Sequence, residues 1–563
     1  MEQLQQLLAA FQKSLSQNPE AWAGFTTFAR WLFPLLAFFI LKRAVSSILT
    51  IPHNQENWGQ LSLPNGTPIP LMHWENILGR GKNADVYLNY PSISRQHAAL
   101  CRNAREEWTI YDLGSKGGTK VNGEAVKDSK QVHLGDRIEL GGVGLIFLPQ
   151  TVGEREELEK KRKEERPASM WPSFLWLSLF QFLACLQLMI AKGEQATPAI
   201  PLAFGGLFLL MWIYVLALRA AHCIGFELET IAFFLCTLSL CVTASSAQGS
   251  LIKQFLAILL GVALFLILGL FLRDLERVQK NRWLMAAGAI GLLGITLVFG
   301  NRKFGAVNWI SLGGFSFQPS EIAKIFYIFA GSATLERLFR RRNLGLFIVL
   351  TGVCIGLLGL MSDFGTAAVF FVTFLVIAYL RSGDFATLSL ICGGAVFGAG
   401  IILKFKPYIM NRFASWGHAW EAASGIGYQQ TRTMSAAASG GLLGMGGGKG
   451  WLRRVAAADT DLVFGMLCEE WGLIIAVLAV LSIITLAFFA ARAAKVGRSS
   501  FYTIAACAAG SLLVFQTSLN VFGAVDLLPL TGVTFPFVSN GGSAMLSAWG
   551  LLAYLKAMDN RDR

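Results

Sequence analysis

Charged residues are scarce in this chain, and their scarcity excludes a soluble protein of this length. Only 15% of the 563 residues are Asp, Glu, Lys or Arg, whereas 54% are hydrophobic. Apolar runs of about 20 residues, the length that spans a bilayer, recur along the sequence. The sequence therefore predicts a polytopic α-helical membrane protein.

Metal-binding and disulfide patterns are also lacking. The six histidines form no ligand cluster, and the nine cysteines show no paired spacing. Several cysteines, including Cys236 and Cys354, lie inside apolar runs, where a thiol acts as a small buried hydrophobe. We therefore expect no metal site built by the protein and no disulfide framework.

Acidic residues do not balance the basic ones, and the net charge is +13. Most basic residues stand in short turns between apolar runs, which is typical of cytoplasmic anchoring rather than nucleic-acid binding. No nucleic-acid partner is expected.

The N-terminal segment, residues 1–51, begins with a polar stretch that has one apolar helical face. An apolar run at 31–41 follows, and a cleavable signal pattern is absent. Extended over 21–41, this run is long enough to anchor the chain across the membrane; otherwise it lies in the interface. The sequence leaves both possibilities open.

Residues 52–150 differ from the rest in composition. Short β-type runs at 99–101, 108–111, 137–140 and 143–148 are separated by Gly, Asn and Asp turns, which predicts an all-β sandwich. A charged linker, 151–170, follows. Within it the six acids and six bases of residues 154–166 cancel, and Glu156/Lys160, Glu157/Lys161 and Glu159/Lys163 form i,i+4 pairs typical of a solvated helix.

Twelve membrane spans are predicted, two in an extra hairpin (171–220) and ten in a membrane domain (221–563). They cover roughly 171–191, 198–219, 228–246, 252–272, 283–300, 321–337, 345–361, 365–381, 385–403, 461–481, 501–522 and 541–557. An even number places the β domain and the C-terminus on one side. Basic loops on that side make it cytoplasmic.

The long loop 404–458 is an exception, because it is predicted outside yet is basic. It contains seven basic residues and only one acidic residue, Glu421. Long loops cross regardless of charge, but a basic outer surface also suits an anionic ligand, and we favour that interpretation. The cations are Lys404, Lys406, Arg412, Arg432, Lys449, Arg453 and Arg454.

The stretch Phe317-Gln-Pro-Ser-Glu321-Ile-Ala-Lys324 places two ionisable side chains at the start of an apolar helix. Pro319 suits the first turn, Glu321 is favoured by the helix dipole, and Lys324 falls on the same face. Charges at membrane depth usually mark function. A self-neutralising pair that only holds two helices in register is equally compatible with the spacing.

Three sequence blocks together resemble the SEDS family (shape, elongation, division and sporulation; FtsW, RodA and SpoVE). They are Trp309 with 317–324; Gly427-Tyr-Gln429 with 439–441, 459–464 and 469–470; and Leu527-Leu-Pro-Leu-Thr-Gly-Val-Thr-Phe-Pro-Phe-Val-Ser-Asn-Gly-Gly-Ser543. The similarity covers about residues 225–557. It implies a ten-span core and a peptidoglycan glycosyltransferase that polymerises lipid II on the outer face of the bacterial plasma membrane.

The resemblance also implies roles for particular residues. Asp461 matches the family's catalytic aspartate and would be the general base, although spacing alone would make it a helix N-cap. Lys324 and Arg412 would neutralise the diphosphate, with Glu321 orienting Lys324. Asp363 matches another polar position but could equally cap the helix from Thr366. A divalent cation (Mg or Mn) at the diphosphate is the only cofactor considered.

Two departures from the family stand in the outer region. The family's upstream Leu-Pro-Glu is replaced by Val455-Ala-Ala457, so one carboxylate is missing, and Asn540 stands where tyrosine is usual. Asp459 adds a carboxylate two residues before Asp461, and like charges this close raise an apparent pKa. The segment with Pro529, Pro536 and its glycines is expected to be re-entrant and structural.

The β segment, residues 52–150, resembles a forkhead-associated (FHA) domain. The matching blocks are Gly79-Arg80, Ser92-Ile-Ser94-Arg95-Gln-His97 and Asp112-Leu-Gly-Ser-Lys-Gly-Gly-Thr119 with Asn122-Gly123. By this resemblance the phosphothreonine site is made by Arg80, Ser94, Arg95 and Lys116, while His97 is structural. Gly117 replaces the family's asparagine, which predicts weaker or altered peptide binding.

The leading hypothesis is a lipid II polymerase coupled to phosphothreonine signalling. A lipid II flippase is an alternative, since the polar groups at membrane depth could line a path. A phosphorylation-gated scaffold of cell-wall or sporulation machinery is a third. The expected partners are lipid II, a class B penicillin-binding transpeptidase and a cytoplasmic phosphothreonine protein; the sequence does not choose among elongation, division and sporulation.

Overall fold

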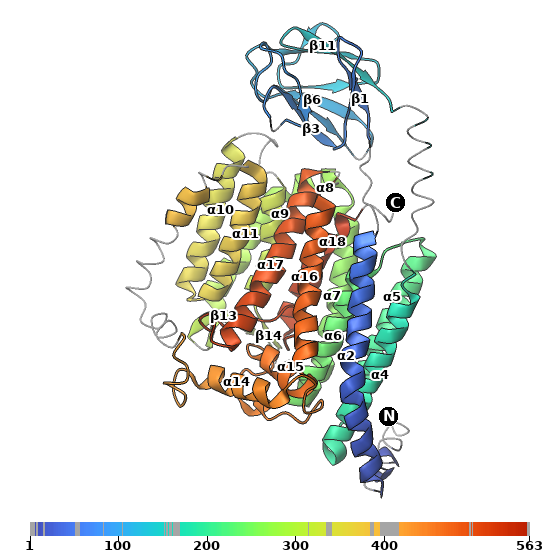
Figure 1. The fold of residues 1–563 in the computed structure, drawn as a ribbon. Coiled ribbons are helices and arrows are strands. Elements are labelled where there is room, and N and C mark those ends of the chain that lie inside the picture. Colours follow the sequence, from blue (N-terminus) through green and yellow to red (C-terminus); the bar gives the residue numbers. More distant parts are fainter. Residues whose placement is uncertain are drawn as a thin grey trace.

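The computed structural model of the chain has a β-sandwich at one end of a helical bundle (Figure 1). It describes residues 6, 10–14, 17–50, 57–82, 84–103, 105–150, 153, 156, 160, 169–303, 305–312, 315–333, 341–382, 385, 388–394, 416–494, 497 and 499–559. Most of the predicted helix 154–166 and most of the predicted span 385–403 lie outside these residues, as does Arg412.

The β-sandwich confirms the predicted all-β domain. One sheet has the order β2-β1-β11-β10-β7-β8 and the other β4-β3-β5-β6-β9, and every pair except β3–β4 is antiparallel. Apolar side chains such as Leu100, Ile138 and Phe147 alternate inward and fill the core. The strands are β1 Gln60–Ser62, β2 Pro68–Pro70, β3 Glu75–Gly79, β4 Val86–Tyr87, β5 Ala98–Arg102, β6 Trp108–Asp112, β7 Thr119–Val121, β8 Glu124–Ala125, β9 Ser129–Val132, β10 Arg137–Leu140 and β11 Val143–Leu148.

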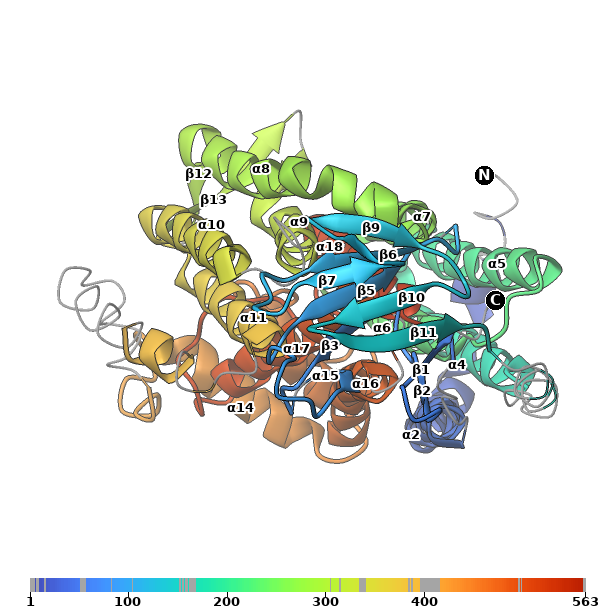
Figure 2. The same ribbon diagram turned by 90° about the horizontal axis from the view of Figure 1, so that it is seen from above.

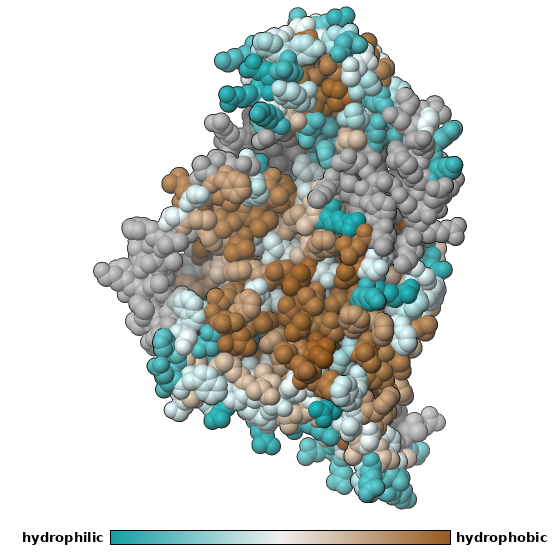
Figure 3. Space-filling view, in the orientation of Figure 1, coloured by the Kyte–Doolittle hydropathy of each residue, from teal (hydrophilic) through white to brown (hydrophobic). Residues whose placement is uncertain are grey.

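Long apolar helices form the second part of the molecule, and brown apolar residues spread over their outer face (Figure 3). Within the described residues, nine helices are long and apolar enough to cross a membrane. The helices are α2 Pro19–Thr50, α4 Trp171–Lys192, α5 Ala199–Ala220, α6 Glu227–Ser246, α7 Leu251–Leu272, α8 Leu275–Phe299, α9 Pro319–Ser332, α10 Arg341–Leu360, α11 Phe364–Ser382, α14 Tyr428–Gly440, α15 Val463–Trp471, α16 Leu473–Ala493, α17 Ser500–Ala524 and α18 Gly542–Ala557.

One predicted span, 461–481, is wrong. The structure divides it into the short helix α15 and the membrane helix α16, with Gly472 between them at φ 93°. Glu469 and Glu470 interrupt the apolar pattern just before this junction, but the predicted span ran through them. Only glycine adopts this left-handed conformation at little cost.

The helix α2 contains residues 21–41, and its length and apolar composition make it a candidate membrane span. It is 32 residues long, contains Pro34, and packs against α4, α6 and α16. Thirty-two helical residues extend about 48 Å, more than the hydrocarbon thickness of a bilayer. With the hairpin α4–α5 it wraps α6, whose apolar window is 100% buried.

The two ends of the bundle carry different structures. The β-sandwich covers the end where α18 finishes, and α14, α15 and a small sheet lie at the opposite end (Figures 1 and 2). That sheet has the order β12-β13-β14 and consists of β12 Asn301–Lys303, β13 Ala306–Leu312 and β14 Phe315–Phe317. This arrangement confirms that the β domain and the end of the last helix share one side.

The β-sandwich is seated on the bundle by direct contacts. Glu75 accepts hydrogen bonds from Ser499 and Ser500, and His73 Nδ1 lies 2.8 Å from Gly497 O. Trp74 is 2% exposed and packs with the helical core. A further pair joins Arg105 and Glu276 at 3.6 Å, with both side chains exposed.

Candidate functional site

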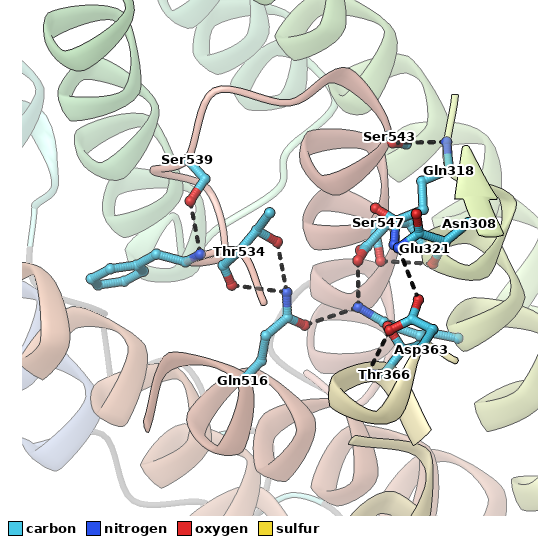
Figure 4. Close-up of polar contacts among 12 residues, drawn as sticks. Asn308, Gln318, Glu321, Asp363, Thr366, Gln516, Thr534, Ser539, Ser543 and Ser547 are labelled. Atoms are coloured by element: carbon cyan, nitrogen blue, oxygen red, sulfur yellow. Dashed lines mark hydrogen bonds and ion pairs between the residues drawn. The ribbon is translucent and has the colours of Figure 1, made fainter. Parts of the chain in front are cut away.

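The start of α9 has the predicted form. Gln318 is the N-cap, Pro319 lies in the first turn, and Glu321 follows it. Lys324 Nζ donates to Glu321 Oε1 at 2.7 Å, and the two side chains are 1% and 5% exposed. The expected pairing of Glu321 with Lys324 is therefore confirmed as a buried ion pair (Figure 4).

Lys324 reaches a second helix as well. Its Nζ donates to Gln516 Oε1 of α17 at 3.1 Å. The amide nitrogen of Gln516 in turn donates to the backbone oxygen and to Oγ1 of Thr534, each at 3.0 Å (Figure 4). Gln516 thus links the ammonium group to the irregular segment 525–541 that precedes α18.

Asp461 is joined to the same segment one helical turn further along α17. Asn520 Nδ2 donates to Asp461 O at 3.1 Å and to Val533 O at 2.8 Å. Asp461 Oδ2 lies over Gly532, where an added Cβ would be 3.3 Å away and where φ is 70°. Lys324 and Asp461 therefore share a single support, made of α17 and residues 532–534.

The N-cap interpretation of Asp461 is wrong. The helix α15 begins at Val463, its N-cap position is Leu462, and no side chain caps it. Asp461 is half-buried.

Asn540, which departs from the family pattern, contacts the additional carboxylate Asp459. Asn540 Nδ2 donates to Asp459 Oδ2 at 2.8 Å, and Asn540 N donates to Asp459 O at 2.8 Å. Ser246 Oγ donates to the same carboxylate oxygen at 3.0 Å, and Ser539 Oγ donates to Thr460 O at 2.6 Å. The contact between Asp459 and Asn540 therefore holds the segment that carries Asp461 against residues 539–540.

Asp363 has a local structural role. Its Oδ1 accepts from Thr366 N at 3.2 Å, as expected for a cap at the start of α11, and its Oδ2 accepts from Asn308 Nδ2 at 3.2 Å. It lies near Glu321 in Figure 4. The capping interpretation is confirmed.

The described part of the basic outer loop presents several cations. Arg432, Lys449 and Arg454 are exposed, whereas Arg453 donates to Gly448 O at 2.7 Å. Two buried carboxylates hold this loop: Glu469 accepts from Trp451 N and Leu452 N, and Glu470 accepts from Gly448 N.

Sequence reasoning assigned no role to Gln516, Asn520 or Ser246. All three are polar side chains inside apolar helices, and that is the signal that could have found them. No group of three His, Cys, Asp or Glu side chains within the described residues could hold a metal ion.

The predicted phosphothreonine residues lie on three neighbouring loops of the β-sandwich. Arg80, Arg95 and Lys116 are exposed. Ser94 Oγ accepts from Lys116 N at 3.1 Å, so its hydroxyl hydrogen can still be donated to a phosphate. His97 bridges the loops through Ser94 N and Gly118 O, as expected for a structural residue.

Crowding accounts for the glycine at position 117. A Cβ there would lie 2.7 Å from Gly141 Cα and 2.9 Å from Ser92 O. An asparagine would therefore force two backbone segments apart. The weaker peptide binding that this departure suggests stays a prediction.

Asp112 orders the loop that carries Lys116. Partial burial raises the pKa of this carboxyl, but hydrogen bonds from Thr119 Oγ1, Ser115 Oγ, Ser115 N and Gly114 N outweigh burial and hold the pKa below its ordinary value. The ionised carboxylate thus stabilises the loop next to the predicted phosphate site.

Comparisons with known proteins identify a family for each of the two domains. Residues 216–563 match the family of FtsW, RodA and SpoVE, described as "Cell cycle protein", and residues 76–141 match the FHA domain. Peptidoglycan glycosyltransferase RodA of Mycobacterium tuberculosis is 29% identical over 55% of this chain and 70% of its own length. The probable peptidoglycan glycosyltransferase FtsW of Escherichia coli O157:H7 is 33% identical over 51% and 71%.

A solved structure described as a peptidoglycan synthase complex is similar at 25% identity, with a TM-score of 0.49, over 60% of this chain and 98% of that chain. The match over residues 216–563 covers more than half of the chain. The chain is thus a multi-pass membrane protein with an FHA domain, and its membrane domain belongs to the FtsW/RodA/SpoVE family.

Proposed function

We propose that this protein is a peptidoglycan glycosyltransferase that polymerises lipid II at the outer face of the bacterial plasma membrane. The observation that carries the proposal is the common support of Asp461 and Lys324. Asn520 and Gln516, one turn apart on α17, hold both groups against residues 533–534. The half-buried carboxylate of Asp461 and the buried ammonium group of Lys324 are held by the same segment. They suit a transfer reaction in which a carboxylate accepts a proton and a positive charge stabilises an anionic leaving group.

The proposed step forms a bond between the 4-hydroxyl of one sugar and the anomeric carbon of another. The bond from that carbon to the polyprenyl diphosphate breaks, and the diphosphate leaves with the electron pair. Asp461 takes the hydroxyl proton as general base. Positive charge offsets the departing diphosphate.

The basic residues of the proposed site differ in burial, and we assign them different roles. Lys324 is 1% exposed, and Glu321 and Gln516 accept two of its three N–H donors. Arg432, Lys449 and Arg454 are exposed and are suited to the first encounter with an anionic substrate. Arg412, outside the described residues, is proposed to join them.

The FHA domain is proposed to lie in the cytoplasm and to read phosphothreonine through Arg80, Ser94, Arg95 and Lys116. Basic turns on its side of the bundle support this orientation. A class B penicillin-binding transpeptidase is the proposed membrane partner, because glycan strands must be crosslinked by a separate activity.

Among the described residues, no group of three His, Cys, Asp or Glu side chains could hold a metal ion. We propose that a divalent cation, if the reaction uses one, arrives with the substrate diphosphate, and no step is assigned to it. Strand synthesis by purified protein in EDTA, with and without added Mg²⁺ or Mn²⁺, measures the requirement.

The deciding experiment compares purified wild type with Asp461→Asn on lipid II. Loss of a general base lowers the rate about 10²- to 10⁴-fold. Glu421→Gln, which removes an exposed carboxylate of the outer loop, serves as the control and is expected to keep full activity. Equal strand synthesis by wild type and Asp461→Asn would remove Asp461 from the mechanism.

Flipping of lipid II is the second candidate function, favoured by the burial of the Glu321–Lys324 pair within the bundle. It predicts that labelled lipid II crosses vesicle membranes at the same rate with Asp461→Asn as with wild type. The scaffold hypothesis predicts instead that Asp461→Asn leaves cell shape and sporulation normal, whereas Arg80→Ala disrupts them.

A further inference from the structure

The FHA domain completes the cap of a helix that belongs to the membrane domain. Glu75, the first residue of β3, accepts from Ser499 Oγ at 2.8 Å, from Ser500 N at 2.7 Å and from Ser500 Oγ at 2.5 Å. Ser499 is the N-cap of α17. The first N–H groups of a helix lack internal partners, and its dipole favours an anion there.

Glu75 is a buried group in this contact. Its side chain is only 8% exposed, and Trp74 beside it packs into the helical core. An acceptor shielded from water in this way holds its donors more firmly than an exposed one. The contact therefore differs in kind from the exposed Arg105–Glu276 pair of the same interface.

The opposite end of α17 carries the side chains that support the proposed catalytic groups. Gln516 and Asn520 lie 16 and 20 positions after Ser500, or about 24 and 30 Å along a helix that rises 1.5 Å per residue. Asn520 holds the backbone of Asp461, and Gln516 holds Lys324. A displacement of α17 along its axis would change both contacts together.

The phosphate end of the FHA domain is tied to the same strand. Arg80 directly follows β3, whose last residue is Gly79. A Cβ on Gly79 would lie 2.3 Å from Arg95 O, so the end of the strand and the loop of Arg95 are in close contact. Five residues of β3 thus separate the predicted phosphate site from the start of α17.

We propose that Glu75 is a positioning residue for the membrane site, through which the FHA domain sets the activity of the glycosyltransferase. Glu75 fixes the position of the N-terminus of α17, and the side chains of Gln516 and Asn520 on α17 hold Lys324 and Asp461. A phosphothreonine peptide at Arg80 changes the rate of strand synthesis through this contact. The inference rests on the proposed function for its catalytic readout.

The test uses the full chain in liposomes, with Glu75→Ala, Glu75→Gln and two controls. Tyr502→Phe removes a hydrogen bond between the start of α17 and Leu272 O, a contact within the membrane domain. Arg105→Ala removes the exposed pair of the interface. Initial rates of lipid II polymerisation are measured with a degenerate phosphothreonine peptide pool, with its unphosphorylated counterpart and with neither.

We expect Glu75→Ala to lower kcat about tenfold, with KM for lipid II unchanged. Glu75→Gln, which keeps an acceptor oxygen, recovers part of the rate. The phosphorylated pool changes the rate of the wild type and of both controls, but not of Glu75→Ala. A wild-type rate in Glu75→Ala, or a peptide response equal in wild type and Glu75→Ala or absent from both, overturns the inference.

Hydrogen exchange separates this inference from the proposed function. The amides of residues 500–504 are expected to exchange about tenfold faster in Glu75→Ala than in wild type, because the capping bonds are lost. If no variant makes glycan strands but this exchange difference appears, the proposed function is wrong, whereas the capping of α17 by Glu75 is confirmed. Unchanged exchange at 500–504 would refute the capping by Glu75.

Discussion

Breaking the buried pair on α9 distinguishes a functional ammonium group from a structural one. Lys324→Met removes the charge and leaves Glu321 alone at 5% exposure. An isolated charge in the bundle is costly, and losing one partner of a buried ion pair destabilises a protein by about 3–5 kcal/mol. Gln516 Oε1 also loses its donor, which adds about 1 kcal/mol.

A second substitution separates the effect of the Lys324 charge on catalysis from the loss of stability. In the double variant Glu321→Gln and Lys324→Met, no buried charge is left, and replacing both members of such a pair is often neutral. We therefore expect the double variant to recover most of the lost stability. Its polymerisation should stay low, because in the proposed function the ammonium group of Lys324 offsets the charge of the departing diphosphate.

The assay pairs denaturant unfolding of the purified protein with initial rates on lipid II. Lys253→Met, at an exposed position on α7, is the matched control and should leave both quantities unchanged. A double variant that is stable and polymerises at the wild-type rate would show that the pair only keeps helices in register. The catalytic role of Lys324 would then be refuted.

Three further predictions concern the outer segments and the FHA domain. In a double-mutant cycle of Asp459→Ala and Asn540→Ala, unfolding should give a coupling of about 1.5–3 kcal/mol, and additive effects would contradict the contact. Gly532→Ala should lower polymerisation severalfold, because φ is 70° and its Cβ would crowd Asp461; Gly269→Ala, with open space around it, should not. Because the pKa of Asp112 is lowered on folding, its contribution to stability is present above the unfolded value of about 3.9 and is lost as pH falls through the folded value. Unfolding of the full chain followed from pH 6 to pH 3 should show this loss in wild type and less of it in Asp112→Asn, and parallel curves would contradict it.

Local patterns predicted much of the fold. The runs 137–140 and 143–148 are the observed bounds of β10 and β11, and the first turn of α9 carries Pro319 and Glu321 as expected. The break at Gly472 was missed because the span was predicted through Glu469 and Glu470, which interrupt the apolar run just before it. The conformation of Gly472 is a property of the backbone that hydropathy does not report.

The site was predicted only where a motif is contiguous in sequence. Glu321 and Lys324 are three residues apart, so their pairing follows from helical spacing. The contact of Asp459 with Asn540 joins positions 81 residues apart, and no periodicity relates them. Asn520 and Gln516 act through tertiary contacts of their amides, which only the folded chain brings to Asp461 and Lys324.

The enclosure of α6 has a consequence for how the protein responds to its lipid. The window of α6 is 100% buried, whereas that of α8 is only 22% buried. A bilayer of altered thickness acts on helices that touch acyl chains, which tilt or distort the lipid to match it. Changes in bilayer thickness therefore act on peripheral helices such as α8. They do not act directly on α6, and so they leave the hydrogen bond from Ser246 to Asp459 unchanged.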